Sequence, residues 1–263
     1  MLTKIAHFLK NMIYNKNAAD VAFLRGDYLV AAQMYYEGAR DGDELASFNY
    51  AYMCLVGLGV PRDPKEAKSF FSFAKNMKGG ESLYNLACMY LEGDGVPKNY
   101  KKALEYMTDA ADSGCIEAQL YMGMAHTLGY MLYPDIVRIC MIPCHTAEYR
   151  DASVPLLMGD IEDEEKDEEL RYSTVRADAR QAFEYFKMAA HHNPTYVADL
   201  VAKGQFLYAK CYIDGLGVDF DMNKGLKIML LAGKSGSEDA KDFLVSNGVS
   251  EQMLLDSAKK YRK

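Results

Sequence analysis

Three copies of one ten-residue pattern, which ends in Gly-x-Gly-Val, constrain the fold of this chain more than any other feature. The copies begin at Ala51, Ala87 and Ala209, and the first two lie 36 residues apart. A sequence that repeats at a period of this length is typical of helical arrays in which each unit packs on its neighbours. The six glycines of the pattern are predicted to form structural turns: Gly57, Gly59, Gly93, Gly95, Gly215 and Gly217.

Each unit is predicted to contain two helices. In the second copy, apolar residues fall at helical spacing both before and after the glycines. The first glycine of each pair can adopt the left-handed conformation that ends a helix, and the second permits a tight connection. Alanines at facing positions let the two helices approach closely, so each unit is an antiparallel hairpin. The apolar positions are Leu83, Leu86, Ala87, Tyr90 and Leu91, then Ala103, Leu104, Met107, Ala110 and Ala111.

The complete pattern, A-x-x-Y-x-x-G-x-G-V followed by K-A-x6-A-A-x-x-G, resembles the Sel-one-like repeat family, close relatives of the tetratricopeptide repeats. The resemblance covers residues 43–244. It implies an all-α fold, a right-handed α/α superhelix (solenoid) of about five antiparallel helix pairs. It also implies a non-catalytic adaptor or scaffold that binds a peptide or protein partner through the concave face of the array.

The array is interrupted once. The third first helix is predicted over residues 116–129, but no Gly-x-Gly-Val follows it, and the second helix resumes only near 178–190. An insertion therefore separates the two helices of one hairpin. The predicted organisation is an N-terminal capping helix (1–17), an atypical first repeat (18–42), repeats (43–129), the insertion (130–178), resumed repeats (179–244) and a C-terminal capping helix (245–263).

The insertion contains a strongly acidic segment. Residues 160–169 carry eight carboxylates and one lysine, which accounts for the whole formal charge of -7. A charge run of this kind is usually a solvated loop, although repeat arrays also place insertions on the binding face. Both interpretations stay open. Because the rest of the chain is formally neutral, general nucleic-acid binding is not expected.

Six cysteines at irregular spacing favour a reducing, cytoplasmic location over a disulfide framework. A secreted branch of the same family, some of whose members are associated with penicillin binding, carries a regular cysteine pair in every repeat. Cys54, Cys88 and Cys211 do not follow that pattern. An envelope-associated or hydrolase-like protein stays an alternative function, and a homo-oligomeric assembly factor is another. No stretch approaches the ~18 apolar residues of a membrane span.

No catalytic, metal or cofactor site is predicted. The glycine loops lack the third glycine and the preceding strand of a dinucleotide site. The insertion offers soft metal ligands, but their spacing departs from that of closed zinc sites. The ligands concerned are Cys140, Cys144 and His145, with His126 upstream.

Partner-binding residues are predicted by aligning the first helices of the repeats. In tetratricopeptide-like arrays the corresponding positions line the concave groove, so the resemblance implies a ladder of side chains that face a partner. An asparagine amide suits this place because it can both donate to and accept from a peptide backbone. The alternative is that Asn49 and Asn85 satisfy backbone groups between neighbouring helices. The predicted set is Asn49, Tyr52, Tyr84, Asn85, Cys88, Tyr121, Met124 and Lys210.

Overall fold

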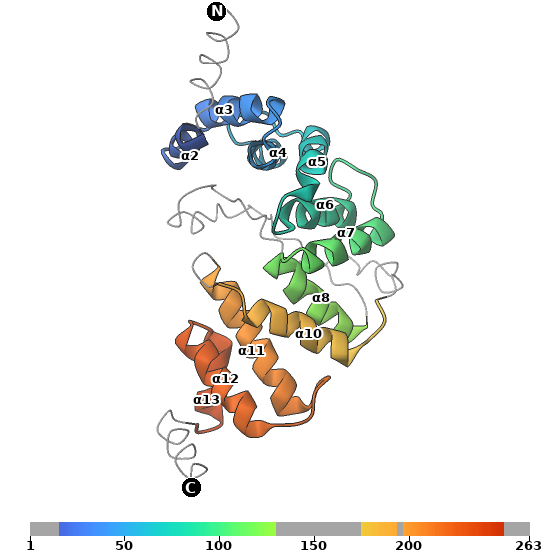
Figure 1. Cartoon of the computed structure of the whole chain (residues 1–263), viewed down its shortest axis with the longest axis vertical. Coiled ribbons are helices and arrows are strands. Elements are labelled where there is room, and N and C mark those ends of the chain that lie inside the picture. Colours follow the sequence, from blue (N-terminus) through green and yellow to red (C-terminus); the bar gives the residue numbers. More distant parts are fainter. Residues whose placement is uncertain (1–15, 130–174, 194–196, 250–263) are drawn as a thin grey trace, which may run out of the picture. The chain divides into compact units, whose positions relative to one another are not determined.

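The chain is helical throughout the part described by its computed structural model, which comprises residues 16–129, 175–193 and 197–249 (Figure 1). No strand occurs within these ranges, and the predicted all-α fold is confirmed. The helices are α2 (Lys16–Leu24), α3 (Tyr28–Arg40), α4 (Glu44–Val56), α5 (Pro64–Phe73), η1 (Ala74–Asn76), α6 (Glu81–Glu92), α7 (Tyr100–Asp112), α8 (Ile116–Leu128), α10 (Ala179–Ala190), α11 (Ala198–Asp214), α12 (Met222–Lys234) and α13 (Glu238–Ser246).

Consecutive helices pack in pairs, and the chain divides into two compact units. The first unit contains the hairpins α2/α3, α4/α5 and α6/α7. The second contains α8/α10 and α11/α12, followed by α13, which packs on α12. The described residues therefore hold five helix pairs, as the repeat pattern predicts. The helix α13 was not predicted, and the two predicted capping helices fall largely outside the described residues.

Polar side chains cap the start of several helices, among them α4, α5, α7, α10, α12 and α13, and left-handed glycines end the first helices α4, α6 and α11. The side chain of Asp43 accepts hydrogen bonds from the backbone of Leu45 (3.0 Å) and Ala46 (3.1 Å), which satisfies two free N–H groups at the start of α4. Gly57 ends that helix with a left-handed φ of 77°. Gly93 and Gly215 end α6 and α11 in the same way, with φ of 77° and 68°.

The second glycine of each loop packs against the start of the preceding hairpin's second helix. A Cβ atom on Gly95 would lie 2.6 Å from the backbone carbon of Pro64, the first residue of α5. A Cβ atom on Gly59 would lie 2.2 Å from the carbonyl oxygen of Tyr28, and on Gly217 it would lie 1.9 Å from that of Ala179. These distances leave no space for a side chain, so glycine is required for one repeat to stack on the next.

An equivalent backbone hydrogen bond closes each of the five hairpins. It runs from the N–H of the residue that caps the second helix to a carbonyl in the last turn of the first helix. The interrupted hairpin has it too, because the N–H of Asp178 donates to the carbonyl of His126 at 2.9 Å. The other four bonds join Asp27 to Ala22, Asp63 to Cys54, Asn99 to Tyr90 and Asp221 to Tyr212, at 2.8–2.9 Å.

The first helices supply most of the core. In α4, every residue from Ala46 to Leu55 is buried. A helix that is apolar around its whole circumference needs neighbours on all sides, and α4 packs against α3, α5 and η1. In the second helix α7, only Ala103, Met107, Ala110 and Ala111 are buried.

Candidate partner-binding face

The predicted partner-binding residues of the first unit are buried. Asn49 is 0% exposed and Asn85 is 1% exposed. These positions are therefore not an exposed ladder in this structure, because α4 is buried around its whole circumference and α6 around most of it. The other buried members of the predicted set are Tyr52, Tyr84, Cys88 and, in the second unit, Tyr121.

The remaining two predicted residues lie in the second unit and contact its own side chains. Met124 of α8 is partly buried and packs against the hydrophobic cluster formed around Phe186. The Nζ atom of Lys210 forms an ion pair with Asp214 at 2.9 Å and lies 5.4 Å above the ring of Phe243 in α13. Because α13 was not predicted from the sequence, this contact could not be anticipated.

The buried amides of Asn49 and Asn85 have no hydrogen-bond partner. Neither the oxygen nor the nitrogen of either amide is within bonding geometry of another group. The hydroxyl of Ser82, one helical turn before Asn85, is in the same situation. Neither amide therefore joins its helix to a neighbouring helix through a direct hydrogen bond. Sequence reasoning missed Ser82, although its spacing of three from Asn85 puts both on one helix face.

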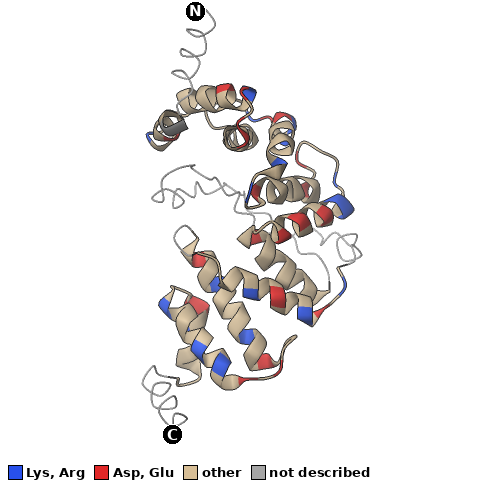
Figure 2. Ribbon diagram, in the orientation of Figure 1, with Lys and Arg blue, Asp and Glu red and all other residues tan. Residues whose placement is uncertain are grey.

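The helices that carry these amides have charged residues only at their ends. All three are acidic: Glu44, Glu81 and Glu92. Second helices carry the charge instead, and Figure 2 shows acidic residues along α7 and basic residues along α12. Any group bound by Asn49 and Asn85 therefore meets no positive side chain from α4 or α6.

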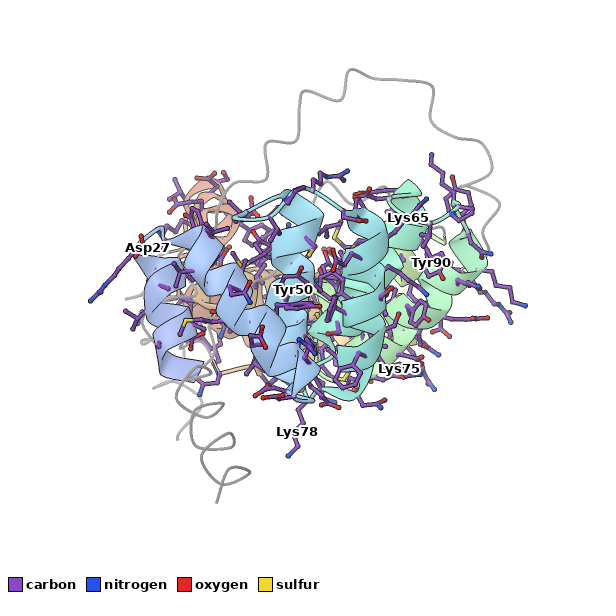
Figure 3. All side chains as sticks on the ribbon, turned by 90° about the horizontal axis from the view of Figure 1, so that it is seen from above. Asp27, Tyr50, Lys65, Lys75, Lys78 and Tyr90 are labelled. Carbon is purple, nitrogen blue, oxygen red and sulfur yellow. The ribbon has the colours of Figure 1, made fainter. Side chains whose placement is uncertain are left out.

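In two hairpins, a tyrosine in the last turn of the first helix contacts a lysine in the first turn of the second helix. In α6/α7 the Nζ atom of Lys102 lies 5.3 Å above the ring of Tyr90, which also stacks on Tyr106 (Figure 3). In α11/α12 the Nζ atom of Lys224 lies 4.2 Å above the ring of Tyr212. Burial opposes ionisation of Tyr212, but hydrogen bonds from Lys224 and Tyr208 outweigh it and lower its pKa.

The hairpin α4/α5 has different residues at these two positions. Cys54 replaces the tyrosine and Glu66 replaces the lysine. Tyr50, one turn earlier, donates a hydrogen bond to Glu66 at 3.4 Å and packs on Phe70 (Figure 3). Burial is the main cause that raises the pKa of the Cys54 thiol to about 12, so the thiol is neutral and unreactive at physiological pH. The contact joins α4 to α5 within the hairpin.

One of the candidate metal ligands lies in the described residues, and the other three do not. Cys140, Cys144 and His145 lie outside the described residues. His126 lies inside them, where its Nδ1 atom is 3.1 Å from the carbonyl of Arg176 and its ring stacks on Tyr185. Among the described residues, no group of three or more His, Cys, Asp and Glu side chains is placed to hold a metal ion. No helix in the described ranges is long and apolar enough to cross a membrane.

A match to a family model shows to which family the chain belongs. The Sel1 repeat model matches residues 45–78, 80–115, 116–138, 169–194 and 202–237, more than half of the chain. The chain belongs to the Sel1 repeat family. Two of the matched segments, 116–138 and 169–194, contain α8 and α10, so the insertion separates two halves of one Sel1 hairpin.

One solved structure shares this fold, and a second is similar to a lesser degree. A Sel1 repeat protein from Oxalobacter formigenes has a TM-score of 0.59 and 21% sequence identity, over 83% of this chain and 49% of that one. The protein c5321, described as a protective antigen of uropathogenic Escherichia coli with an SLR fold, has a TM-score of 0.45 and 19% identity, over 89% of this chain and 50% of that one. This chain spans about half the length of both. No curated protein matches it significantly.

Proposed function

We propose that this Sel1 repeat chain is a non-catalytic adaptor that binds a peptide or protein partner in the cytoplasm. The observation that carries the proposal is the array itself: four Sel1 hairpins, preceded by the helix pair α2/α3, with equivalent closing hydrogen bonds, a fold whose typical role is protein interaction. Repeat arrays bind through surfaces that extend over several units. Of the contact residues proposed from the repeat alignment, Met124 and Lys210 are partly exposed, whereas a partner would reach the six buried ones only if the side chains over them move: Asn49, Tyr52, Tyr84, Asn85, Cys88 and Tyr121.

The cytoplasmic location is supported by the cysteines. Cys54 and Cys211, in the described part of the chain, are thiols outside any disulfide. Burial raises the pKa of Cys211 to about 12, as it does for Cys54, which keeps both thiols neutral. Alkylation of thiols in intact cells, followed by mass spectrometry of the denatured chain, tests this location. Oxidised cysteines in the native protein would contradict it.

Quantitative affinity capture from native cells tests the adaptor role. The immobilised full chain is compared with a helical protein of the same size and charge, which controls for nonspecific adsorption. We expect one or a few proteins to be enriched by the full chain alone and to bind it directly once purified. Equal recovery of every protein on both baits would overturn the proposal.

A further inference from the structure

Two second helices, α7 of the first unit and α12 of the second, occupy the same place in their hairpins. Each follows a short glycine loop, is 13 residues long and ends at a serine. The caps also correspond, because the side chain of Asn99 accepts from the backbone of Lys102, and that of Asp221 accepts from the backbone of Lys224. The two helices can therefore be compared position by position.

The exposed positions of α7 and α12 carry opposite charge. Glu105 and Asp109 of α7 correspond to Lys227 and Leu231 of α12, and all four side chains are exposed. After its first turn α7 contains only acidic ionisable residues, whereas α12 contains three lysines and no acidic residue (Figure 2). The first unit therefore presents an acidic helix face, and the second unit presents a basic one at the equivalent position.

These charges are not neutralised within the chain's described residues. In that part of the structure, Glu105, Asp109 and Lys227 form no ion pair. Other exposed charges pair along their own helix, as Lys241 does with Glu238 at 2.6 Å. In addition, Leu231 is 51% exposed on the basic helix. Both faces thus offer charges to another molecule, and α12 also offers apolar surface.

The spacing of the charges shows which molecule fits. Glu105 and Asp109 stand four residues apart and Lys224 and Lys227 three, so each pair lies on one side of its helix about one turn apart. The basic face of α12 therefore suits two carboxylates held at helical spacing, and α7 carries such a pair. A second copy of this chain brings the matching face to each of the two helices.

We propose that the chain self-associates, with α7 of one copy docked against α12 of a second copy. Glu105 and Asp109 pair with Lys224 and Lys227 of the other copy, and Leu231 loses solvent between the two helices. Exposed ion pairs contribute little individually, so the contact is weak and is lost as salt screens the charges. Self-association through these faces is independent of the adaptor function.

An exchange of corresponding residues tests the contact. Glu105→Lys/Asp109→Leu gives α7 the residues of α12, and Lys227→Glu/Leu231→Asp gives α12 those of α7. Each variant then carries two faces of like charge. We expect sedimentation velocity at low salt to show an association constant at least about fivefold below that of the wild type. An equimolar mixture of the two variants should associate again, because the basic faces of one meet the acidic faces of the other.

Recovery in the mixture separates a lost contact from a damaged fold, since a misfolded variant is not rescued by mixing. Asp239→Lys/Asp242→Leu, at exposed positions of α13, changes the net charge as much as the α7 variant does and should leave association unchanged. Replacing the eight carboxylates of residues 160–169 by amides should not weaken it either.

Four results would overturn the proposed contact. They are a wild-type chain that stays monomeric at low salt, single-face variants that associate like the wild type, a mixture that does not recover, and an amide variant that no longer associates. The last result would assign the basic face of α12 to the acidic segment instead of α7. Each of the four leaves the adaptor function standing, because affinity capture tests that function separately.

Discussion

The hairpins α6/α7 and α8/α10 close in the same way, although very different lengths of chain join their helices. In α6/α7 five residues separate Gly93 from the cap Asn99, whereas in α8/α10 the insertion separates Gly129 from the cap Asp178. The closing hydrogen bond is 2.9 Å in both, and both first helices end at a glycine with φ near 80°. Helix ends therefore determine how a Sel1 hairpin closes, and the connection can vary.

The connections of the two hairpins differ in sequence at the glycine that packs against the preceding repeat in α6/α7. Gly95 in the α6/α7 loop packs directly against Pro64 of α5. The corresponding position of α8/α10 falls in residues 130–174, outside the described ranges, and the sequence there has no Gly-x-Gly-Val. We infer that the second glycine of each short loop joins one repeat to the next.

Substitution of a loop glycine should have the largest effect on the free energy of unfolding. Gly95→Val adds a side chain where the backbone has a φ of 70° and where Pro64 leaves no space. We expect a loss of about 1–3 kcal/mol in the free energy of unfolding, measured by urea denaturation. Leu216→Ala, at a variable and partly buried loop position, is the comparison and should cost about 1 kcal/mol or less. The reverse ranking would contradict the role assigned to the glycine.

Replacing the insertion by the short loop tests whether the connection is free to vary. Residues 130–177 are exchanged for the five residues 94–98, Asp-Gly-Val-Pro-Lys. Loop-closure entropy favours the shorter connection by about 2 kcal/mol, so the melting temperature of the variant should rise. A fall would show that the insertion contributes contacts to the folded unit. Loss of partner capture without a change in melting would place the insertion on the binding surface.

Removal of a helix cap should reduce stability less than these changes do, and by the same amount in the two hairpins. The side chain of Asp178 accepts from Arg180 and Gln181, and that of Asn99 accepts from Lys102. Replacing either cap by alanine should cost about 1 kcal/mol. Thermal melts of Asp178→Ala and Asn99→Ala check this. A clearly larger cost for Asp178 would mean that the interrupted hairpin depends on its cap because the short loop is missing.

The helices near the glycine pattern were predictable because local chemistry fixes them. Asp178 was identified as the point where the interrupted hairpin resumes, and α10 begins directly after it. The half-repeat α13 was not identified, because it follows the last glycine loop and lacks the complete pattern. The burial of Asn49 and Asn85 was not predictable either, since helical spacing identifies a face without showing what packs against it.

The sequence alone determined the repeat period, the paired helices, the turn glycines and the place of the interruption, because these depend on backbone conformations that glycine, caps and apolar spacing select locally. Only the tertiary structure decided that α4 and α6 are covered on all sides, that the loop glycines pack against the preceding helix, and that two asparagine amides are buried without partners. These features depend on contacts between residues of different helices, and the free energy of those contacts exists only once the hairpins have stacked.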